Sequence, residues 1–477
     1  MAKDTRLGLT AKKESNFLEW YNEVVVRAEM ADYSAVKGCM VIRPRAYTVW
    51  ESIQEFVNTR IKANGVQNAY FPLFIPERFF KREAEHAQGF HPEVAWIGNK
   101  DEEEERLAVR PTSETIISES FAKWLRSHRD LPIKINQWAN VVRWETKTTR
   151  LFLRTREFLW QEGHCLYETN EQAEKEVLFY LDLYEQVARE LLAVPVIKGR
   201  KSEMEKFAGA LYTTAIEGFM PSGMALQLGT SHNLGQGFMR AFGVEYLGRD
   251  SQKHNPWYIS WGISTRVIGA AIMQHSDDKG LVLPPNIAYS KAVIVPILFD
   301  DTREKVLAKA KEVKELLSEF NAVLDDREEY SPGWKFNEWE LKGMPLRIEL
   351  GPKDLENEQA VVVRRDTGEK KFVKLAELKE HAGRELEAMQ KELLAGAEKH
   401  LKDNTVEAST YEQLEKGIKE NKLVIAPFCG RGSCEESLKE KLGASSRCFP
   451  FNQRKQDYKC IHCGDKAGEK AYFAKAY

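Results

Sequence analysis

Hydrophobic and polar positions repeat along the first half of the chain with two different periods. Residues 14–30 and 171–193 have the period of a helix, and Ser15 is the expected N-cap of the first helix. Residues 137–167 alternate with the period of a strand and predict an antiparallel hairpin. The same patterns predict strands at 222–229 and 257–261 and a helix at 264–275. Hairpin-linked strands with flanking helices favour an antiparallel α+β domain over a doubly wound one.

The pattern changes after the two prolines in "LVLPPNIAYS". A continuous apolar strand begins within "KAVIVPILF", and a helix at 302–320, the strands "PLRIELG" and "QAVVVRRD", and a helix at 375–395 then alternate. This order predicts a compact α/β domain. A third unit follows after about residue 400 and contains five of the seven cysteines. A chain of 477 residues is too long for one compact core, and the predicted domains are 1–285, 286–400 and 401–477.

The charge balance argues against long-range attraction to nucleic acid. The chain has 70 Lys and Arg residues against 72 Asp and Glu residues, a net charge of −2, so any contact with phosphate must come from local patches. No run of about 18 apolar residues predicts a membrane span, and the first residues do not resemble a signal peptide. Seven cysteines in a chain of this length do not suggest a disulfide framework. The expected location is the cytoplasm.

The predicted hairpin carries many ionised groups. Arg143 and Glu145 share one face of the first strand, and Trp160, Glu162 and His164 share one face of the return strand. The loop between them adds further cations, which are Lys147, Arg150, Arg154 and Arg156. A solvated face is one interpretation, since exposed ion pairs contribute little to stability. The other is a site for a polyanion and a small zwitterion, because the planar fork of Arg matches phosphate and carboxylate.

Three other segments have two interpretations each. In "AVRPTSETI", Thr112 and Glu114 could bind a cationic amine, although Thr-Ser-Glu before an apolar run also marks a helix start. His232 lies between glycines in "QLGTSHNLGQGF", where a loop residue is the simpler interpretation. Arg266 begins the helix in "WGISTRVIGAAI", and the helix dipole disfavours a cation there. A bound phosphate would explain this arginine.

Two close pairs of cysteines form the most specific pattern in the chain. Four residues separate Cys429 from Cys434, and two separate Cys460 from Cys463. The spacing is typical of a tetrahedral site for zinc or another thiophilic metal. Four thiolates leave no open position, so the metal would be structural. A redox dithiol is the alternative, but it would not require the second pair.

Together these segments resemble the class II aminoacyl-tRNA synthetases, and among them the prolyl branch of the archaeal and eukaryotic type, over nearly the whole chain. The strand before Pro44 and the helix after it resemble the first motif of the class, which builds a homodimer interface. "RWE", the loop with Arg154, and "REF" resemble the second motif, and "GISTRVIGAA" resembles the third. "RPTSE", "WQEGH" and "GTSHNLG" are similar to segments typical of the prolyl branch.

The resemblance implies a two-step ligase that uses ATP and Mg²⁺ to activate L-proline and then transfers it to the 3′ end of tRNA(Pro). The implied catalytic residues are Arg143, which would bridge the proline carboxylate and the α-phosphate, and Arg266, which would hold the γ-phosphate. The implied proline-binding residues are Thr112, Glu114, Arg143, Trp160, Glu162, His164, Phe207 and His232. The implied ATP-binding residues are Arg143, Glu145, Arg154, Thr155, Phe158, Gln227, Thr230 and Arg266.

Two departures from related enzymes affect the expected chemistry. Many class II enzymes have an acidic magnesium ligand where this chain has Gln227. Roughly sixty residues separate Tyr167 from Leu226, too few for the editing domain that bacterial prolyl enzymes often carry there. A pocket by itself discriminates against a missing methylene by only about 1–3 kcal/mol. The resulting hypothesis is misactivation of alanine or cysteine, without internal hydrolysis of the mischarged product.

The second domain is similar to the anticodon-binding fold shared by several class II enzymes, with "NEWELKGMPLRIELGPKDLE" as its recognisable segment. The candidates to read the anticodon are Glu340, Arg347, Lys353 and Asp354. Surface charges on a strand and a turn explain these residues equally well. The third unit resembles the zinc-bearing C-terminal extension of the prolyl branch. In relatives a terminal tyrosine lies toward the active site, which implies the same for Tyr477.

Three other functions compete with this interpretation. An adenylate-forming enzyme of different specificity and a synthetase-like paralogue that does not charge tRNA would share the fold. The paralogue predicts erosion of Arg143, Arg266 or the anticodon domain, and all are intact. A zinc-dependent RNA-binding module would explain the cysteines and basic residues, but not the Thr112–Glu114 segment together with Arg266. Proline-dependent ATP–pyrophosphate exchange would exclude this module.

Overall fold

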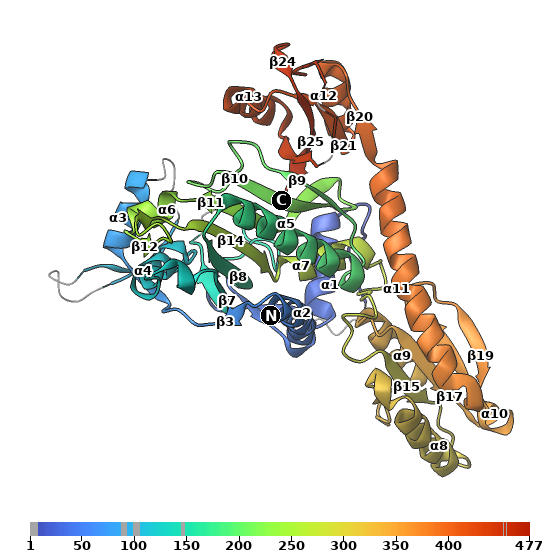
Figure 1. The fold of residues 1–477 in the computed structure, drawn as a ribbon. Coiled ribbons are helices and arrows are strands. Elements are labelled where there is room, and N and C mark those ends of the chain that lie inside the picture. Colours follow the sequence, from blue (N-terminus) through green and yellow to red (C-terminus); the bar gives the residue numbers. More distant parts are fainter. Residues whose placement is uncertain (1–7, 87–92, 99–104, 145–147, 452, 455) are drawn as a thin grey trace.

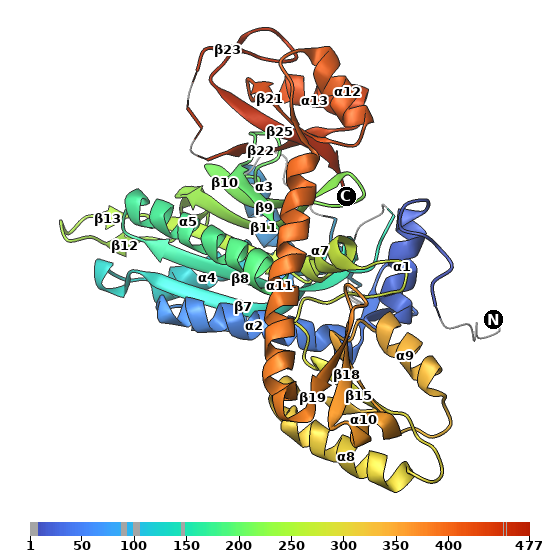
Figure 2. The same ribbon diagram turned by 90° about the vertical axis from the view of Figure 1, so that its right-hand side faces the viewer.

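The computed structural model of the protein describes residues 8–86, 93–98, 105–144, 148–451, 453–454 and 456–477. A large central body lies between two smaller units, which the long helix α11 (Leu378–Asp403) connects (Figure 1). Figure 2 shows α11 crossing the central body on its way from one small unit to the other. Gln390 fastens the helix to this body, because its amide donates to the Glu190 carbonyl oxygen at 2.9 Å.

An antiparallel sheet forms the centre of the large body, which confirms the predicted fold class. Its strands follow the order β9, β10, β11, β14, β8, β7 and β3, and among them β3 alone runs parallel to its neighbour. The predicted hairpin is confirmed, since β7 and β8 pair antiparallel along their whole length. The strand bounds are β3 Gln67–Asn68, β7 Ile133–Val142, β8 Glu157–Tyr167, β9 Val196–Arg200, β10 Tyr212–Phe219, β11 Met224–Gly235 and β14 Trp257–Ser264.

Alternation along β8 decides which residues face the helices. Residues two apart share a face of a strand, so Glu162 and His164 lie together and Gly163 faces the other way. A Cβ atom on Gly163 would lie 1.9 Å from the Trp261 ring. That ring stacks on Tyr180 with 3.7 Å between the ring centroids. The glycine therefore leaves the space in which an aromatic pair packs the covering helix against the sheet.

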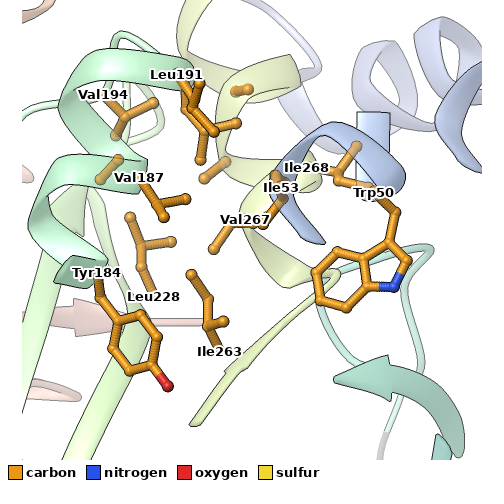
Figure 3. Close-up of a cluster of buried hydrophobic side chains, with 14 of the residues drawn as sticks. Trp50, Ile53, Tyr184, Val187, Leu191, Val194, Leu228, Ile263, Val267 and Ile268 are labelled. Carbon is orange, nitrogen blue, oxygen red and sulfur yellow. The ribbon is translucent and has the colours of Figure 1, made fainter. Parts of the chain in front are cut away.

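Helices α1, α2, α5 and α7 cover one face of the sheet and share its main hydrophobic core. Figure 3 shows Trp50, Tyr184 and Val267, one from each of three helices, in one cluster with Leu228 and Ile263 of the sheet. A second apolar cluster joins α3, α4 and α6. The helix bounds are α1 Phe17–Arg27, α2 Pro44–Ala63, α3 Glu77–His86, α4 Glu114–Trp124, α5 Asn170–Gln186, α6 Gly237–Ala241 and α7 Arg266–His275. In the part of the chain that the structure describes, no helix is both long and apolar enough to cross a bilayer.

Two helix boundaries differ from the sequence prediction. Asn16 caps the first helix, because its Oδ1 accepts a backbone N–H of the first turn at 3.4 Å. Ser15 is not the cap, since the capping residue must stand directly before the first helical residue. The helix predicted to end at 395 continues as α11 to Asp403, because Ala397 still packs into the interior.

The unit after the central body contains a mixed sheet in the order β16, β15, β17, β18 and β19. β15 runs parallel to β16 and β17, whereas β18 runs antiparallel to its two neighbours, β17 and β19. This confirms the predicted α/β domain, in which "KAVIVPILF" supplies the buried strand β15. The bounds are β15 Ala292–Pro296, β16 Val323–Leu324, β17 Leu346–Leu350, β18 Gln359–Arg364, β19 Lys370–Lys374, α8 Arg303–Leu316, α9 Pro332–Leu341 and α10 Pro352–Glu356.

The sheet of the C-terminal unit continues the central sheet, which the sequence did not predict. β22 pairs with β9, where Phe449 lies opposite Arg200, and β25 pairs with the start of β11. Gly199 permits this contact, because a Cβ atom there would lie 2.2 Å from the Phe449 carbonyl oxygen. The bounds of this unit are β20 Thr405–Glu407, β21 Leu423–Phe428, β22 Ser445–Pro450, β23 Tyr458–Lys459, β24 Lys466–Ala467, β25 Glu469–Ala476, α12 Tyr411–Lys419 and α13 Gly432–Leu442.

A buried ion cluster holds the C-terminal unit on the central sheet. Glu217 of β10 accepts hydrogen bonds from Lys201 Nζ at 2.6 Å and from Arg447 Nη2 of β22 at 2.8 Å. The three residues are only 1%, 4% and 6% exposed. Burial by itself raises the pKa of Glu217, but Arg447 and Lys201 outweigh it and hold the pKa below its usual value. The carboxylate therefore stays ionised and binds cations from both units.

Candidate active site

A small cavity opens on the face of the sheet opposite the main core. Its volume is about 140 Å³, below the roughly 300–1,000 Å³ of pockets for drug-sized ligands. All residues predicted to contact proline line this cavity, which are Thr112, Glu114, Arg143, Trp160, Glu162, His164, Phe207 and His232. Gln227 and Thr230 lie in the same wall. The fold thus brings side chains from separate segments around a space suited to a small molecule.

Glu162 is the centre of a buried hydrogen-bond network. Its Oε1 accepts from Ser113 Oγ and from Gln137 Nε2, both at 2.5 Å, and its Oε2 lies 3.1 Å from His164 Nε2. The other ring nitrogen of His164 lies 2.6 Å from the Tyr258 hydroxyl. Burial raises the pKa of Glu162, but the bonds from His164, Ser113 and Gln137 outweigh it and the pKa is lowered. The solvated-face interpretation is wrong for Glu162 and His164, because both side chains are buried.

The segment before α4 does not use its hydroxyls to cap the helix. Thr112 Oγ1 donates to Glu114 Oε2 at 2.5 Å, and the Ser113 hydroxyl donates to Glu162. Ser113 occupies the N-cap position, but its side chain makes no capping hydrogen bond. The helix-start interpretation is right that a helix begins here, at Glu114, but wrong that the hydroxyls cap it. The arrangement instead sets two carboxylates in the cavity wall, where they would attract a cationic amine.

A second cavity adjoins the first. It is lined by Phe158, Arg266 and the backbone around Gly229, among others. Five residues line both cavities, which are Arg143, Trp160, Gln227, Thr230 and Gly262. The Arg143 guanidinium carbon lies 5.6 Å from the Phe158 ring centroid and 5.7 Å from that of Trp160. Arg143 therefore stands at the border between the two spaces, with an aromatic wall beside it.

Arg266 is held at the start of α7 by backbone oxygens. Its Nε donates to the Leu153 carbonyl at 3.1 Å and its Nη1 to the Gln227 carbonyl at 3.3 Å. Burial, followed by the charges of Arg143 and Arg154, lowers its pKa to about 10. Several guanidinium groups thus repel one another around a cavity. A bound polyanion would relieve this repulsion, which agrees with the reason the sequence suggested for a cation at a helix start.

Two of the described residues that were predicted to contact ATP, Arg154 and Thr155, do not line the second cavity. Arg154 lines a neighbouring cavity together with Gln227 and Arg266. The Thr155 hydroxyl donates to the Glu157 carbonyl oxygen at 2.7 Å, so a local turn uses this group. Glu145 lies outside the residues that the structure describes.

The cysteine pairs come together at one end of the C-terminal unit. The Sγ atoms of Cys429, Cys434, Cys460 and Cys463 lie within 4.8 Å of one another. Cys429 Sγ is 3.6 Å from Cys434 Sγ and 4.0 Å from Cys463 Sγ. Tetrahedral bonds of about 2.3 Å from zinc would place sulfur atoms about 3.8 Å apart. The four thiols therefore fit a closed tetrahedral metal site.

Models of three protein families match successive parts of the chain. They are described as tRNA synthetase class II core domain (G, H, P, S and T) at residues 95–275, anticodon binding domain at 291–383 and prolyl-tRNA synthetase, C-terminal, at 411–477. A proline–tRNA ligase of Alkaliphilus oremlandii is 50% identical over 469 residues, 97% of each chain. One of Lachnoclostridium phytofermentans is 48% identical over 483 residues, 100% of each chain. The chain belongs to the proline–tRNA ligase family. Enzymes of this class II synthetase family use ATP and Mg²⁺.

The sequence of this proline–tRNA ligase family member did not lead us to predict that residues of β14 line the site. Ser260 and Gly262 line the first cavity, and Gly262 and Ser264 line the second. Small residues at every second position of a strand leave room on one face of the sheet. This pattern in the sequence could have predicted that β14 lines a cavity. The contacts of Ser113 and Gln137 with Glu162 had no such signal, because 49 and 25 residues separate the partners.

The anticodon candidates of this ligase family member lie on three elements of the second unit. Arg347 of β17 packs 4.4 Å above the Phe336 ring of α9 and donates to Glu349 Oε1 at 2.9 Å. Glu340 of α9 pairs with Lys279 at 3.0 Å. Asp354 caps α10 by accepting the Gly351 N–H at 2.9 Å. Lys353 lies beside Asp354 in the same helix. Arg347 and Glu349 are paired, and Asp354 already has a structural role.

His232 lies on β11 in the cavity wall, and not in a loop. The Thr213 hydroxyl oxygen accepts the Phe207 N–H at 2.9 Å and lies 2.8 Å from His232 Nδ1. Burial, followed by the charges of His164 and Arg143, lowers the pKa of His232 to about 3. The ring is therefore neutral at physiological pH.

This low pKa predicts a pH dependence of stability. Between about pH 3 and 6.5 the unfolded chain binds more protons at this site than the folded protein, so the free energy of unfolding rises with pH across this window and levels off above it. Between pH 7 and pH 5 this site should lower the free energy of unfolding of the wild-type protein by about 2 kcal/mol. We expect His232→Gln to lack this decrease. Thermal unfolding measured at several pH values checks this, with His128→Gln as the control. Equal slopes for both variants would contradict it.

Proposed function

We propose that this chain activates L-proline with ATP and transfers the prolyl group to the 3′ end of tRNA(Pro). The observation that carries the proposal is the position of Arg143 at the border of two cavities. A guanidinium placed there can bind a carboxylate on one side and an α-phosphate on the other through its planar fork. Relatives that match the chain over nearly its full length are named proline–tRNA ligases, which supports the same assignment.

In the first step, a carboxylate oxygen of proline bonds to the α-phosphorus of ATP. The bond from that phosphorus to the bridging oxygen breaks, and pyrophosphate leaves with the electron pair. Negative charge grows on the phosphoryl oxygens, and Arg143 and Arg266 are already in place to stabilise it. Mg²⁺ supplies further positive charge when bound, mainly through phosphate oxygens. Gln227, which borders both cavities, offers a carboxamide oxygen as a protein ligand.

The first cavity supplies the groups that would recognise proline. Thr112 and Glu114 are already hydrogen-bonded to each other, and their free lone pairs can accept the two N–H groups of the imino cation. The rings of Phe207 and His232 lie 5.1 Å apart at an angle of 47° and would wall the pyrrolidine ring together with Trp160. A neutral His232 adds no charge that would repel the cation.

In the second step, a terminal hydroxyl of tRNA attacks the carbonyl carbon of prolyl-adenylate, and AMP leaves. The unit built on β15 and β17 would bind the anticodon, with Arg347, Glu340, Lys353 and Asp354 as the candidate contacts. The match of residues 291–383 to an anticodon binding domain supports this role. Arg347 above the Phe336 ring presents its guanidinium beside an aromatic face, a combination suited to an unstacked base.

ATP–pyrophosphate exchange with each of the twenty amino acids tests the proposed function. We expect proline to support the fastest exchange and to be the amino acid esterified to purified tRNA(Pro). Exchange that requires a different amino acid would indicate an adenylate-forming enzyme of another specificity. Proline-dependent exchange without charging of tRNA would indicate a synthetase-like paralogue. A protein without exchange for any amino acid would contradict the proposal.

The same assay addresses discrimination between amino acids. Residues 168–225 are used by α5, β9 and β10 of the central sheet and the segments between them, which supports an enzyme without an internal editing domain. We propose that alanine or cysteine is activated at a low rate, because the loss of ring atoms changes binding by only about 1–3 kcal/mol per methylene. Exchange at background level with both amino acids would contradict this.

We propose that the four clustered cysteines hold a structural Zn²⁺. Cys460→Ser should lower the metal content from about one ion per chain to nearly none, and should lower the unfolding temperature of the C-terminal unit, because metal binding to such sites contributes folding free energy. Elemental analysis after dialysis gives the first quantity, and calorimetry gives the second. Cys39→Ser is the matched control, since Cys39 is not one of the clustered cysteines. A wild-type protein without bound metal would rule the site out.

We also propose that the protein is a homodimer that acts in the cytoplasm, with functional domains at 1–285, 286–400 and 401–477. The segment that resembles the dimer-forming motif consists of β2 (Met40–Ile42) and α2, and it exposes apolar side chains together with the adjoining strand β1 (Ala31–Tyr33). Tyr33 is 65% exposed, Val41 49% and Tyr47 42%, and aromatic residues of this kind are enriched at protein interfaces. Sedimentation equilibrium at micromolar concentration tests the dimer, and a monomer would contradict it.

A further inference from the structure

A third cavity lies between the central body and the C-terminal unit. Its volume is about 400 Å³, and it shares Gln227 and Arg266 with the proposed nucleotide cavity. The rest of its wall comes partly from the loop that carries Arg154 and partly from α13 and β22. Arg154 and Arg266 are candidates to bind ATP, but the part of the wall that α13 and β22 supply has no role in the proposed chemistry. It therefore needs an explanation of its own.

The wall of this cavity is strongly cationic. Arg154, Arg266, Lys439 and Arg447 line it, together with two residues that carry a carboxylate, Glu205 and the C-terminal Tyr477. Arg447 is neutralised by Glu217. Arg154 and Lys439, by contrast, make no side-chain ion pair within the described part of the chain. The cavity thus holds more positive charge than its own carboxylates balance, and Arg154 is among the charges that lower the pKa of Arg266.

We propose that this cavity is a pyrophosphate-binding site, which Lys439 of the C-terminal unit completes. The inference rests on the proposed function, since Arg266 would hold the γ-phosphate at the point where the two cavities meet. When the bond to the α-phosphorus breaks, the departing anion carries the γ-phosphate with it. The path beyond Arg266 leads into a space with cations on its far wall. An inorganic polyanion of this size and charge is the ligand that such a wall would bind.

The arrangement gives the C-terminal unit a role in the reaction. α13 begins near Cys434 of the metal cluster and ends beside the cavity, so the metal site and Lys439 are on one rigid helix. β22 then passes into the central sheet through its pairing with β9. The cavity wall is therefore fixed at both ends. Weak binding there would hold the product as it leaves and would favour its recapture in the reverse reaction.

Kinetics with inorganic pyrophosphate test the proposal in the full-length protein. Lys439→Ala should raise the KM for pyrophosphate in proline-dependent exchange by about three- to tenfold, and Lys439→Glu should raise it further. The KM for ATP should change by less than about twofold, because the site would bind the product after it has left. Lys441→Ala and Lys441→Glu are the matched controls, since they make the same charge changes on the same helix without lining the cavity.

Calorimetric titration of pyrophosphate into proline-free protein separates this inference from the proposed function. Weaker binding to Lys439→Glu than to Lys441→Glu would support the site even without turnover. Equal binding constants and equal KM values for the two variants would overturn it. A parallel rise in the KM for ATP would overturn it as well, because the cavity would then belong to the substrate and not to the product. Loss of exchange in the wild-type protein would contradict only the proposed function.

Discussion

Arg143→Ala should lower kcat/KM for proline in ATP–pyrophosphate exchange by about 10³-fold, the loss typical of removing one preorganised donor to a developing negative charge. The effect should be large because this side chain borders both cavities, so its removal affects the orientation of both reactants and the stabilisation of the charge that forms between them. Steady-state exchange at several proline and ATP concentrations measures the change and separates kcat from KM.

Two comparisons make this experiment specific. Arg143→Lys keeps the charge but loses the planar fork, and should recover only part of the activity. Arg240→Ala removes an exposed arginine from α6, which lines neither cavity, and should leave exchange unchanged. Thermal unfolding must show that the Arg143 variants are folded. A folded Arg143→Ala protein with activity within about tenfold of the wild type would refute the bridging role.

Glu217→Gln should lower the free energy of unfolding by about 3–5 kcal/mol, the usual cost of breaking a buried ion pair. The neutral amide would leave Lys201 and Arg447 buried without the carboxylate that accepts hydrogen bonds from both. Because Arg447 belongs to β22 and Glu217 to β10, the variant should also loosen the C-terminal unit from the central sheet. Urea unfolding followed by tryptophan fluorescence measures the first effect, and hydrogen exchange in β22 measures the second.

The pair of Arg200 and Glu469 provides the control. It joins the same two units at 2.9 Å, but its side chains are 49% and 28% exposed. Glu469→Gln should therefore change stability by less than about 1 kcal/mol. The Glu217 carboxylate has a lowered pKa, so its contribution should be complete above its unfolded pKa of about 4.3 and should disappear as pH falls below that value. Equal destabilisation by both substitutions would contradict the importance of burial.

Much of the fold could be predicted, because it depends on local patterns. The period-two alternation around Glu162 predicted the β7–β8 hairpin, and the apolar run around Ile294 predicted a buried strand. Local rules were less reliable for side chains that choose between two partners. The Ser113 hydroxyl stands where a helix cap is expected, yet it bonds Glu162, 49 residues away. A hydroxyl takes whichever acceptor the tertiary structure offers at the better distance.

The residues of the candidate site also divide into those that short sequence segments predict and those that only the tertiary structure brings together. Thr112, Glu114 and His232 could be identified as candidates from short segments and from family resemblance, and all three line the first cavity. Ser260 and Gly262 were missed, although their small size at alternate positions was visible. The role of α13 in the wall of the third cavity had no local signal, because Lys439 and Arg266 approach the same space from separate domains.

The amino-acid sequence by itself determined the order of strands and helices. It also identified the paired cysteines as candidate metal ligands and Arg143 and Arg266 as candidate catalytic residues. These features depend on residue type and short spacing, which a linear pattern contains. Only the tertiary structure decided that Glu217 binds Arg447, 230 residues away, and that the C-terminal unit extends the central sheet. Such contacts depend on the packing of whole elements, since a strand edge or a buried charge selects its partner by position in space and not by distance along the chain.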